Sequence, residues 1–492
     1  MAITRRQFIG RASLATAGTL FGPQLFRNPF LSQALASTIG DRYFIVLFLD
    51  GGNDGLNTII PVTGGLRSPY EDNRKTGAGG LRIANPLVPA VGPGAPAFID
   101  PNTGSQLGFH PGLAKIRDMY EHGMVSVVQG CGYPEYSLSH QVSRSIWERG
   151  SPFDSLGTGW MGRYLAAPSS GYIGSDIPAV NIGNSVSGEY NQSATSVLVF
   201  DRLSDFGFPY DPSFADDSAA KDILFNALYG NAGATAHPFM QNLSGTGTST
   251  LTATQQYPVL HDDYIADRQS WSDMYADENV PGLDTSTARG FREIAKVIYG
   301  GARGAIPANL QARLFELRNG GYDTHSNQGA EETKGDHFRL HQEVAESINL
   351  FYQDLADMAS GASVGSGLYD LPNKVTVMVF SEFSRRIEQN DDGTDHGSQG
   401  PVFVIGGANA LNGGIYGNHI DIANTDGDGN SIYSQDNLDG FRSTDFRDVY
   451  GTIMKHWLGL ANPAALFPLD STLGLVGPEY WNTANFNLGF LP

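Results

Sequence analysis

The chain is poor in cysteine, in positive charge and in long apolar runs, and each shortage excludes a class of protein. With Cys131 as its one cysteine, it cannot form an intramolecular disulfide or a zinc–thiolate cluster. None of its apolar runs approaches the roughly 20 residues of a membrane-spanning helix. Its 31 lysines and arginines stand against 51 aspartates and glutamates, and such an acidic surface repels a phosphate backbone. We therefore expect no nucleic-acid partner and no stable membrane span.

The first 36 residues have the features of a targeting segment. Arg5 and Arg6 precede an aromatic and an aliphatic residue, in a pattern that resembles the twin-arginine export signal. A weakly hydrophobic stretch follows, and residues 34–36 form an Ala-x-Ala cleavage pattern. The sequence therefore predicts a signal peptide over residues 1–36, with the twin-arginine translocation machinery as a partner. It also predicts a periplasmic or secreted protein.

The rest of the chain alternates strand-like and helix-like segments. Hydrophobic residues make up 40% of the sequence, enough for a large core, and we expect a single domain over residues 37–492. Nearly continuous apolar runs predict buried strands, and the alternation predicts an α/β fold with a mostly parallel central sheet flanked by helices. The pattern weakens over about residues 184–281, where we expect an insertion or cap over the sheet. The predicted strands are 42–49, 124–128, 312–317, 374–380 and 402–405, and the predicted helices are 111–122, 139–150, 160–165, about 261–276, 331–358 and 444–458.

Polar side chains that bind metals well lie at the carboxyl ends of the predicted strands, where ligands gather in open α/β sheets. Asp50 follows the first strand, Asp323 and His325 follow the third, Glu382 follows the fourth, and His396 precedes the fifth. Carboxylates and imidazoles are the ligands that divalent zinc, manganese and magnesium prefer. The sequence therefore predicts a site for one of these metals or calcium, with these five residues as ligands.

The glycine-rich stretch GGNDG, residues 51–55, also has a phosphate-binding interpretation. It has no Lys-Ser or Lys-Thr ending and lacks the three-glycine dinucleotide spacing, so neither motif is present. Asp50 and Asp54 would repel an anion unless a cation lay between. We expect the glycines to turn the chain sharply. The sequence leaves open whether Asp54 reaches the metal or only caps the next turn.

Six motifs together resemble one protein family. In chain order they are LFLDGGNDGLNTIIPV, SHQVSRSIWERG, GWMGRYL, GYDTHSNQ, VFSEFSRR and DHGSQGPVFVIGG. Their order and number are similar to those of the bacterial family called domain of unknown function 1501, whose members commonly carry twin-arginine signals. The resemblance runs from about Arg42 to Leu460. The family is in turn similar to the alkaline phosphatase and sulfatase superfamily, which implies an alkaline-phosphatase-like fold.

The resemblance also implies a role for each strand-end residue. Asp50 stands where the superfamily has its first metal ligand. Asp323 and His325 stand where it has an Asp-plus-His pair, and His396 stands where it has its last histidine. Glu382 departs from the pattern, because the superfamily usually has an Asp-His or Asp-Asn pair at that place.

Ser139 and His140 are the candidate catalytic residues. Ser139 stands near the superfamily's nucleophile, at a predicted helix N-terminus whose dipole favours an anion. The resemblance implies metal-assisted hydrolysis of a phosphate or sulfate ester, in a small molecule or a polymer. Arginines bind such anionic groups in a bidentate manner. The candidate substrate-binding residues are Asn53, Asp54, Arg144, Arg385 and Arg386.

Two other functions stay open. The missing ligand pair at Glu382 also fits a non-catalytic exported binding or assembly protein that keeps a degenerate alkaline-phosphatase-like fold. The third hypothesis is a serine hydrolase that uses Ser139 without a metal.

Overall fold

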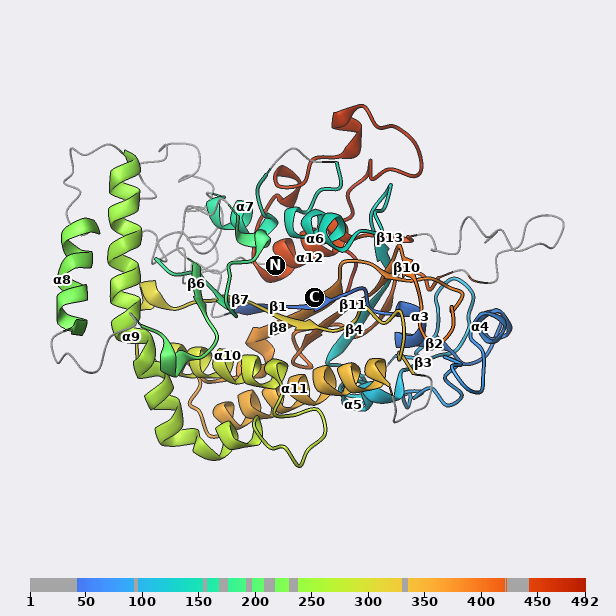
Figure 1. The fold of residues 1–492 in the computed structure, drawn as a ribbon, viewed down its shortest axis with the longest axis horizontal. Coiled ribbons are helices and arrows are strands. Elements are labelled where there is room, and N and C mark those ends of the chain that lie inside the picture. The colour runs from blue at the N-terminus through green and yellow to red at the C-terminus, as the bar shows by residue number, and fades with distance from the viewer. Residues whose placement is uncertain are drawn as a thin grey trace, which may run out of the picture.

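The computed structural model describes residues 42–92, 96–153, 157–167, 176–191, 197–207, 217–229, 238–329, 335–420, 422 and 442–492. The signal peptide predicted over residues 1–36 lies outside this part of the chain. Nine strands form one central sheet in the order β12–β4–β11–β8–β1–β7–β5–β6, with β13 also paired to β4 (Figure 1). Their bounds are β1 Tyr43–Asp50, β4 Val125–Gly132, β5 Ala179–Ile182, β6 Val197–Phe200, β7 Leu314–Gly320, β8 Val375–Ser381, β11 Gly400–Gly406, β12 Gly414–Tyr416 and β13 Thr444–Asp445.

The pairing within the sheet confirms the predicted mostly parallel α/β fold. β1 pairs in parallel with both β7 and β8, and every residue from Tyr43 to Leu49 is buried, which explains the continuous apolar run. β11 is the exception, because it runs antiparallel to its neighbours β4 and β8. The described residues 382–399 between β8 and β11 contain a short hairpin, β9 (Ser384–Arg385) with β10 (His396–Gly397), and no helix. A parallel neighbour usually needs a crossover that contains a helix.

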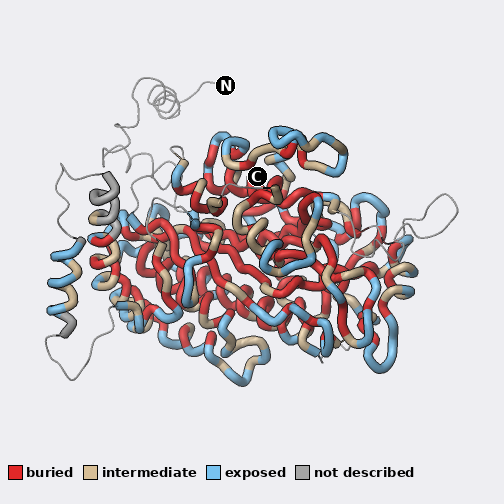
Figure 2. Tube along the Cα trace, turned by 45° about the horizontal axis from the view of Figure 1, so that its top comes forward, coloured by how far each residue is buried: buried red, intermediate tan, exposed pale blue. Residues whose placement is uncertain are grey.

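Helices cover both faces of this sheet. Along β1, Ile45 and Leu47 face one core, which includes residues of α5, α9, α10 and α11, and Val46 and Phe48 face another, which includes residues of α6, α7 and α12. Figure 2 shows the buried segments as a band through the middle of the molecule. The helices are α3 Gly55–Thr58, α4 Arg67–Asn73, α5 Ala114–Glu121, α6 His140–Arg149, α7 Trp160–Ala166, α8 Asp217–Tyr229, α9 Pro238–Met274, α10 Ser286–Arg303, α11 Asp336–Ala359 and α12 Phe446–Thr452. A further small sheet pairs β2 (Ile59–Pro61) with β3 (Leu107–Phe109).

The segment predicted as an insertion or cap, residues 184–281, departs from that description in two ways. Its strand β6 belongs to the central sheet, paired in parallel with β5. Its helix α8 and the start of α9 lie beyond the β6 edge, at the opposite end of the molecule from α3 (Figure 1). The later part of α9 packs on α10 below the sheet. Weak periodicity marks this segment as irregular, but it cannot indicate where the segment packs.

Several other boundaries also differ from the predictions, such as that of β7, which ends at Gly320 and not at Leu317, and that of α9, which begins at Pro238 and not near His261. The C-terminal helix begins at Phe446 and not at Thr444, because Asp445 caps it by accepting a hydrogen bond from the Arg447 N–H at 3.0 Å. Its last turn, Ile453–Trp457, is π-helical. Among the described residues, the helices are too short or too polar to cross a bilayer.

Candidate metal centre

The carboxyl ends of three neighbouring parallel strands form one edge of the sheet. In the order β8–β1–β7, Ser381 lies beside Leu49, and Asp50 lies beside Gly320. The loops that follow these strands therefore start side by side, as the sequence predicts. The start of α6 reaches the same place, because the carbonyl oxygen of Leu138 accepts a hydrogen bond from His396.

Three side chains bring ligand atoms together at this edge: His140 at the start of α6, Asp323 after β7, and His396 in β10. One nitrogen or oxygen of each lies within 4.8 Å of the others. Nε2 of His140 is 3.3 Å from Oδ2 of Asp323, and Nε2 of His396 is 3.2 Å from Oδ1. Two imidazoles and one carboxylate are a common ligand set for divalent transition metals.

Hydrogen bonds determine which nitrogen of each ring carries the proton. Nδ1 of His396 lies 2.6 Å from the Leu138 carbonyl oxygen, which can only accept, so this nitrogen is the donor. Nδ1 of His140 lies 2.8 Å from Oε1 of Glu382 and donates in the same way. In the neutral rings, both Nε2 lone pairs therefore face the oxygens of Asp323. A cation or a proton between acceptors that face one another in this manner stabilises them, and the lone pair of His396 can also accept from Nε2 of His325, 2.9 Å away.

His325 lies at the rim of this cluster. Its Nε2 is 2.9 Å from Nε2 of His396 and 3.1 Å from Oδ1 of Asp323, and its Nδ1 is 3.3 Å from Oδ1 of Asp395. The ring is about half exposed. It contacts two of the three cluster residues, His396 and Asp323, but lies outside the set whose ligand atoms are all within 4.8 Å of one another.

Glu382, predicted as a metal ligand, lies behind the cluster. Its side chain is fully buried, and its oxygens accept hydrogen bonds from the backbone N–H groups of Gly51 and Gly52 and from the hydroxyl of Ser381. Its remaining contact is with Nδ1 of His140. A carboxylate on the distal nitrogen of a metal-binding histidine orients the ring and raises its basicity. The position of Glu382 fits that role and not direct ligation.

Asp50, the other predicted ligand from β1, also stands outside the cluster. Its carboxylate is paired with the guanidinium of Arg144, one turn along α6 from His140. Arg144 lies over the ring of Phe48, 5.6 Å from its centroid. Arg144, a candidate anion-binding residue, is thus held at the edge of the site by Asp50, which the sequence predicts to bind metal.

Asn53 and Asp54, predicted to bind substrate, are both buried inside the loop. Asp54 caps α3 by accepting a hydrogen bond from the Asn57 N–H at 3.2 Å, and it forms a fully buried ion pair with Arg74 at 2.9 Å. The question of whether it binds metal or caps a turn is therefore answered in favour of the cap. Asn53 contacts the buried side chain of His337 and not solvent.

Arg385 is likewise a structural residue and not an exposed clamp for substrate. Its buried guanidinium donates hydrogen bonds to the carbonyl oxygens of Gly51, Gly52 and Tyr322, and to Oδ1 of Asp323 at 2.7 Å. It holds the glycine turn and Asp323 together.

Arg386, its neighbour, is half-buried, and its backbone bonds to Asp395 and Arg74.

Ser139 occupies the N-cap position of α6 with its side chain exposed and makes no capping hydrogen bond. Its two neighbours both contact the cluster, since Leu138 bonds to His396 and His140 belongs to it. Ser139 is therefore adjacent in the chain to the cluster, and its hydroxyl is free of the capping role that a serine at this position usually has.

Charge at the site follows from these contacts. Partial burial opposes ionisation of Asp323, but the hydrogen bond and charge of Arg385 outweigh it and lower its pKa to about 2. The hydrogen bond that His140 donates to Glu382 raises the pKa of His140. Burial lowers the pKa of His396. Asp323 is thus anionic and His396 neutral at physiological pH, as metal binding requires.

Sequence reasoning missed a second group of histidines below the glycine turn. His337 and His341 lie one turn apart on α11, and His110 packs against both. The four-residue spacing within the predicted helix 331–358 places both side chains on one helix face and was the available signal. Nothing local connects His110 to them.

Comparison with known proteins supports the family. Residues 302–433 match the model of the family described as Protein of unknown function (DUF1501), which confirms the family predicted from the motifs. The matched segment carries Asp323, Glu382 and His396 but not His140. No curated protein matches the chain. The crystal structure of the lipoteichoic acid synthase LtaP from Listeria monocytogenes is similar over 84% of this chain and 82% of that one, at 8% identity and a TM-score of 0.28. A likeness at that level carries no information about activity.

Proposed function

We propose that this DUF1501 protein is a metal-dependent hydrolase of phosphate or sulfate esters, with a divalent cation held by His140, Asp323 and His396. One observation carries the proposal: two imidazole lone pairs face a carboxylate whose pKa is lowered to about 2. Export through the twin-arginine machinery to the periplasm or the medium stays a prediction from residues 1–36.

The residues present fit such a cation. The donor set is two nitrogens and a carboxylate, which suits zinc or manganese better than calcium. Each ligand is oriented by a partner behind it: Glu382 for His140, the Leu138 carbonyl for His396, and Arg385 for Asp323. Outer partners of this kind are typical of metal sites.

A bound divalent cation supplies Lewis acidity to an ester oxygen and favours ionisation of a nearby hydroxyl. The chain's own contribution is positioning. Ser139 presents its hydroxyl at the helix N-terminus, where the dipole stabilises an oxyanion. Arg144 stands one turn further along α6 and can exchange Asp50 for the anionic group of a substrate. His325, half exposed at the rim, would accept at Nε2 the proton that the Ser139 hydroxyl loses and would return it to the leaving oxygen of the ester.

The alternative, a non-catalytic binding or assembly protein, is favoured by a different observation. Asp50 and Glu382 are both occupied by protein partners, so neither of these two predicted ligands is available to a second cation. A single bound metal without turnover is the signature of this alternative.

Metal analysis and activity together separate the two. Protein folded in the cytoplasm and purified without chelator is expected to carry one divalent metal per chain and to melt at higher temperature with zinc or manganese. It is expected to hydrolyse an aryl phosphate or aryl sulfate, and Ser139→Ala should remove turnover and keep the metal. His122→Gln, an exposed histidine on the chain after α5, is the matched control. Metal binding without turnover supports the alternative, and absence of metal binding rejects both.

A further inference from the structure

We infer that His337, buried below the glycine turn, is a positioning residue for the metal ligand His140. This inference rests on the proposed metal site. His337 belongs to a group of three histidines with His110 and His341, whose ring centroids are 4.1 to 5.0 Å apart. All three are buried.

This group is not a second metal centre. Nδ1 of His110 accepts a hydrogen bond from the Gly112 N–H at 3.0 Å, and Nε2 of His341 lies 3.1 Å from the hydroxyl of Thr58. Nε2 of His337 lies 2.9 Å from Oδ1 of Asn53. In the part of the chain that the structure describes, ligand atoms of three such residues converge only at the His140 cluster.

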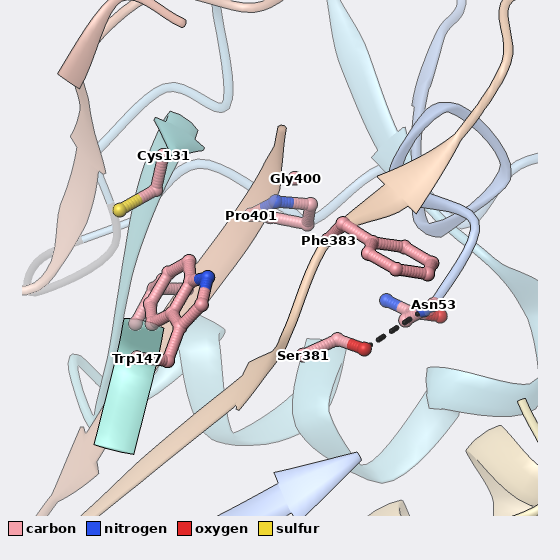
Figure 3. Close-up of a pocket in the computed structure, with 8 residues that line it drawn as sticks. Asn53, Cys131, Trp147, Ser381, Phe383, Gly400 and Pro401 are labelled. Carbon is pink, nitrogen blue, oxygen red and sulfur yellow. Dashed lines mark hydrogen bonds between the residues drawn. The ribbon is translucent and has the colours of Figure 1, made fainter. Parts of the chain in front are cut away.

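The contact with Asn53 begins a chain of hydrogen bonds that ends at the metal ligand. Asn53 donates its backbone N–H to Oγ of Ser381 at 3.0 Å, drawn as the dashed line in Figure 3. The single proton of the Ser381 hydroxyl is shared between the Leu49 carbonyl oxygen at 2.6 Å and Oε2 of Glu382 at 3.0 Å, and Oε1 of the same carboxylate accepts from Nδ1 of His140 at 2.8 Å. Each contact from His337 to His140 is 3.0 Å or shorter, and the covalent structure of Asn53 joins its side chain to its N–H.

Few other contacts hold Asn53 in place. Its side chain bonds only to Thr58 and His337 among the described residues, and the ring of Phe383 lies beside it in Figure 3. Because Oδ1 of Asn53 accepts, Nε2 of His337 must carry the proton. Nδ1 of His337 has no partner, so its hydrogen bond to Asn53 is the one polar tie between this ring and the loop. A buried side chain without that donor would fill the same space but would not hold Asn53 by a hydrogen bond, so the glycine turn would be less constrained.

His110 provides a matched control. It is as buried as His337, and both rings pack against His341. Its polar contact, however, is with Gly112 and not with the glycine turn. His110→Leu and His337→Leu are therefore expected to lower the melting temperature of the metal-free protein by similar amounts. Only the second breaks the path to His140.

The test is metal affinity of the full folded chain, measured with Co²⁺ by chelator competition and by its visible absorption. We expect His337→Leu to weaken Co²⁺ binding by about tenfold and to change the absorption bands, at the low end of outer-partner effects. His337→Gln, which restores an amide donor, is expected to recover most of the affinity, and His110→Leu should keep that of the wild type. Ser381→Ala interrupts the same path at a half-buried residue and should weaken binding similarly.

Each outcome decides the matter. Wild-type affinity and spectra in both His337→Leu and Ser381→Ala would overturn the inference and leave the metal site intact. Equal loss in His110→Leu and His337→Leu would also overturn it, because the effect would then be general destabilisation. A wild-type protein that binds no Co²⁺ would overturn the proposed function itself, which is a distinguishable result.

Discussion

The two histidine clusters of this protein contain the same residue type and behave in opposite ways. His140, His325 and His396 lie at the sheet edge, partly exposed and surrounded by carboxylates. His110, His337 and His341 lie a short distance below, fully buried, with hydroxyl, amide and backbone partners. The first cluster gathers lone pairs around an anion and suits a cation. The second must stay neutral and suits only hydrogen bonding.

The largest expected effect concerns the buried cluster and acid. Burial lowers the pKa of His110 to about 3 and lowers those of His337 and His341 well below the usual 6.5, helped for His337 by the nearby charges of Arg74 and Arg385. Since the folded pKa values lie below the unfolded ones, stability is complete above pH 6.5 and falls as the pH drops. At pH 5 the loss is on the order of 2 kcal/mol for His110, and His337 and His341 add to it in the same direction.

Denaturant unfolding at pH 7 and pH 5 measures this loss. His110→Leu should flatten the pH dependence, because one titrating group is gone. A free energy of unfolding that is equal at the two pH values would contradict the neutral, buried state of this cluster.

The next effect concerns the carboxylate at the centre of the edge cluster. Asp323→Asn keeps the size of the side chain and removes the charge that both imidazoles face. We expect metal affinity to fall by more than about 100-fold, beyond the 10- to 100-fold typical of outer partners. Isothermal titration with Zn²⁺ checks it, and Asp395→Asn, also an exposed carboxylate beside His325, is the control.

Glu382→Gln probes the carboxylate behind His140. The amide keeps the shape but loses the charge-assisted hydrogen bond that raises the pKa of His140. We expect metal affinity to fall by roughly 10- to 100-fold while one metal still binds. Complete loss of binding would instead return Glu382 to the ligand set that the sequence predicted.

The smallest effect is expected at the rim. His325 is about half exposed and touches the cluster from one side. His325→Gln should change metal affinity by less than about tenfold, below the usual effect of a ligand or its buried partner. Turnover should fall more than affinity, because this residue is assigned to proton transfer. A loss of affinity as large as that of Asp323→Asn would make His325 a full ligand.

The position of the site was predictable from the sequence, but its bonding was not. Apolar runs locate β1, β7 and β8, and parallel pairing then brings Asp50, Asp323 and Glu382 to one edge. Whether each carboxylate is free depends on partners that are distant in the chain. Arg144 forms an ion pair with Asp50, and the N–H groups of the glycine turn donate hydrogen bonds to Glu382.

Two other features could not be predicted from the sequence. The antiparallel direction of β11 depends on which strands it pairs with, β4 and β8, and the predicted strand boundaries do not give that pairing. His110 joins His337 and His341 only through tertiary packing, although the spacing of the last two on α11 is visible in the sequence.

The most direct test of the metal site is an anomalous-scattering map from crystals of the full-length protein grown with Zn²⁺ or Mn²⁺. We expect one strong peak bounded by Nε2 of His140, Nε2 of His396 and the carboxylate of Asp323, with metal–ligand distances of roughly 2.0–2.2 Å. A peak at Asp50 and Glu382 instead, or none at this edge of the sheet, would contradict it.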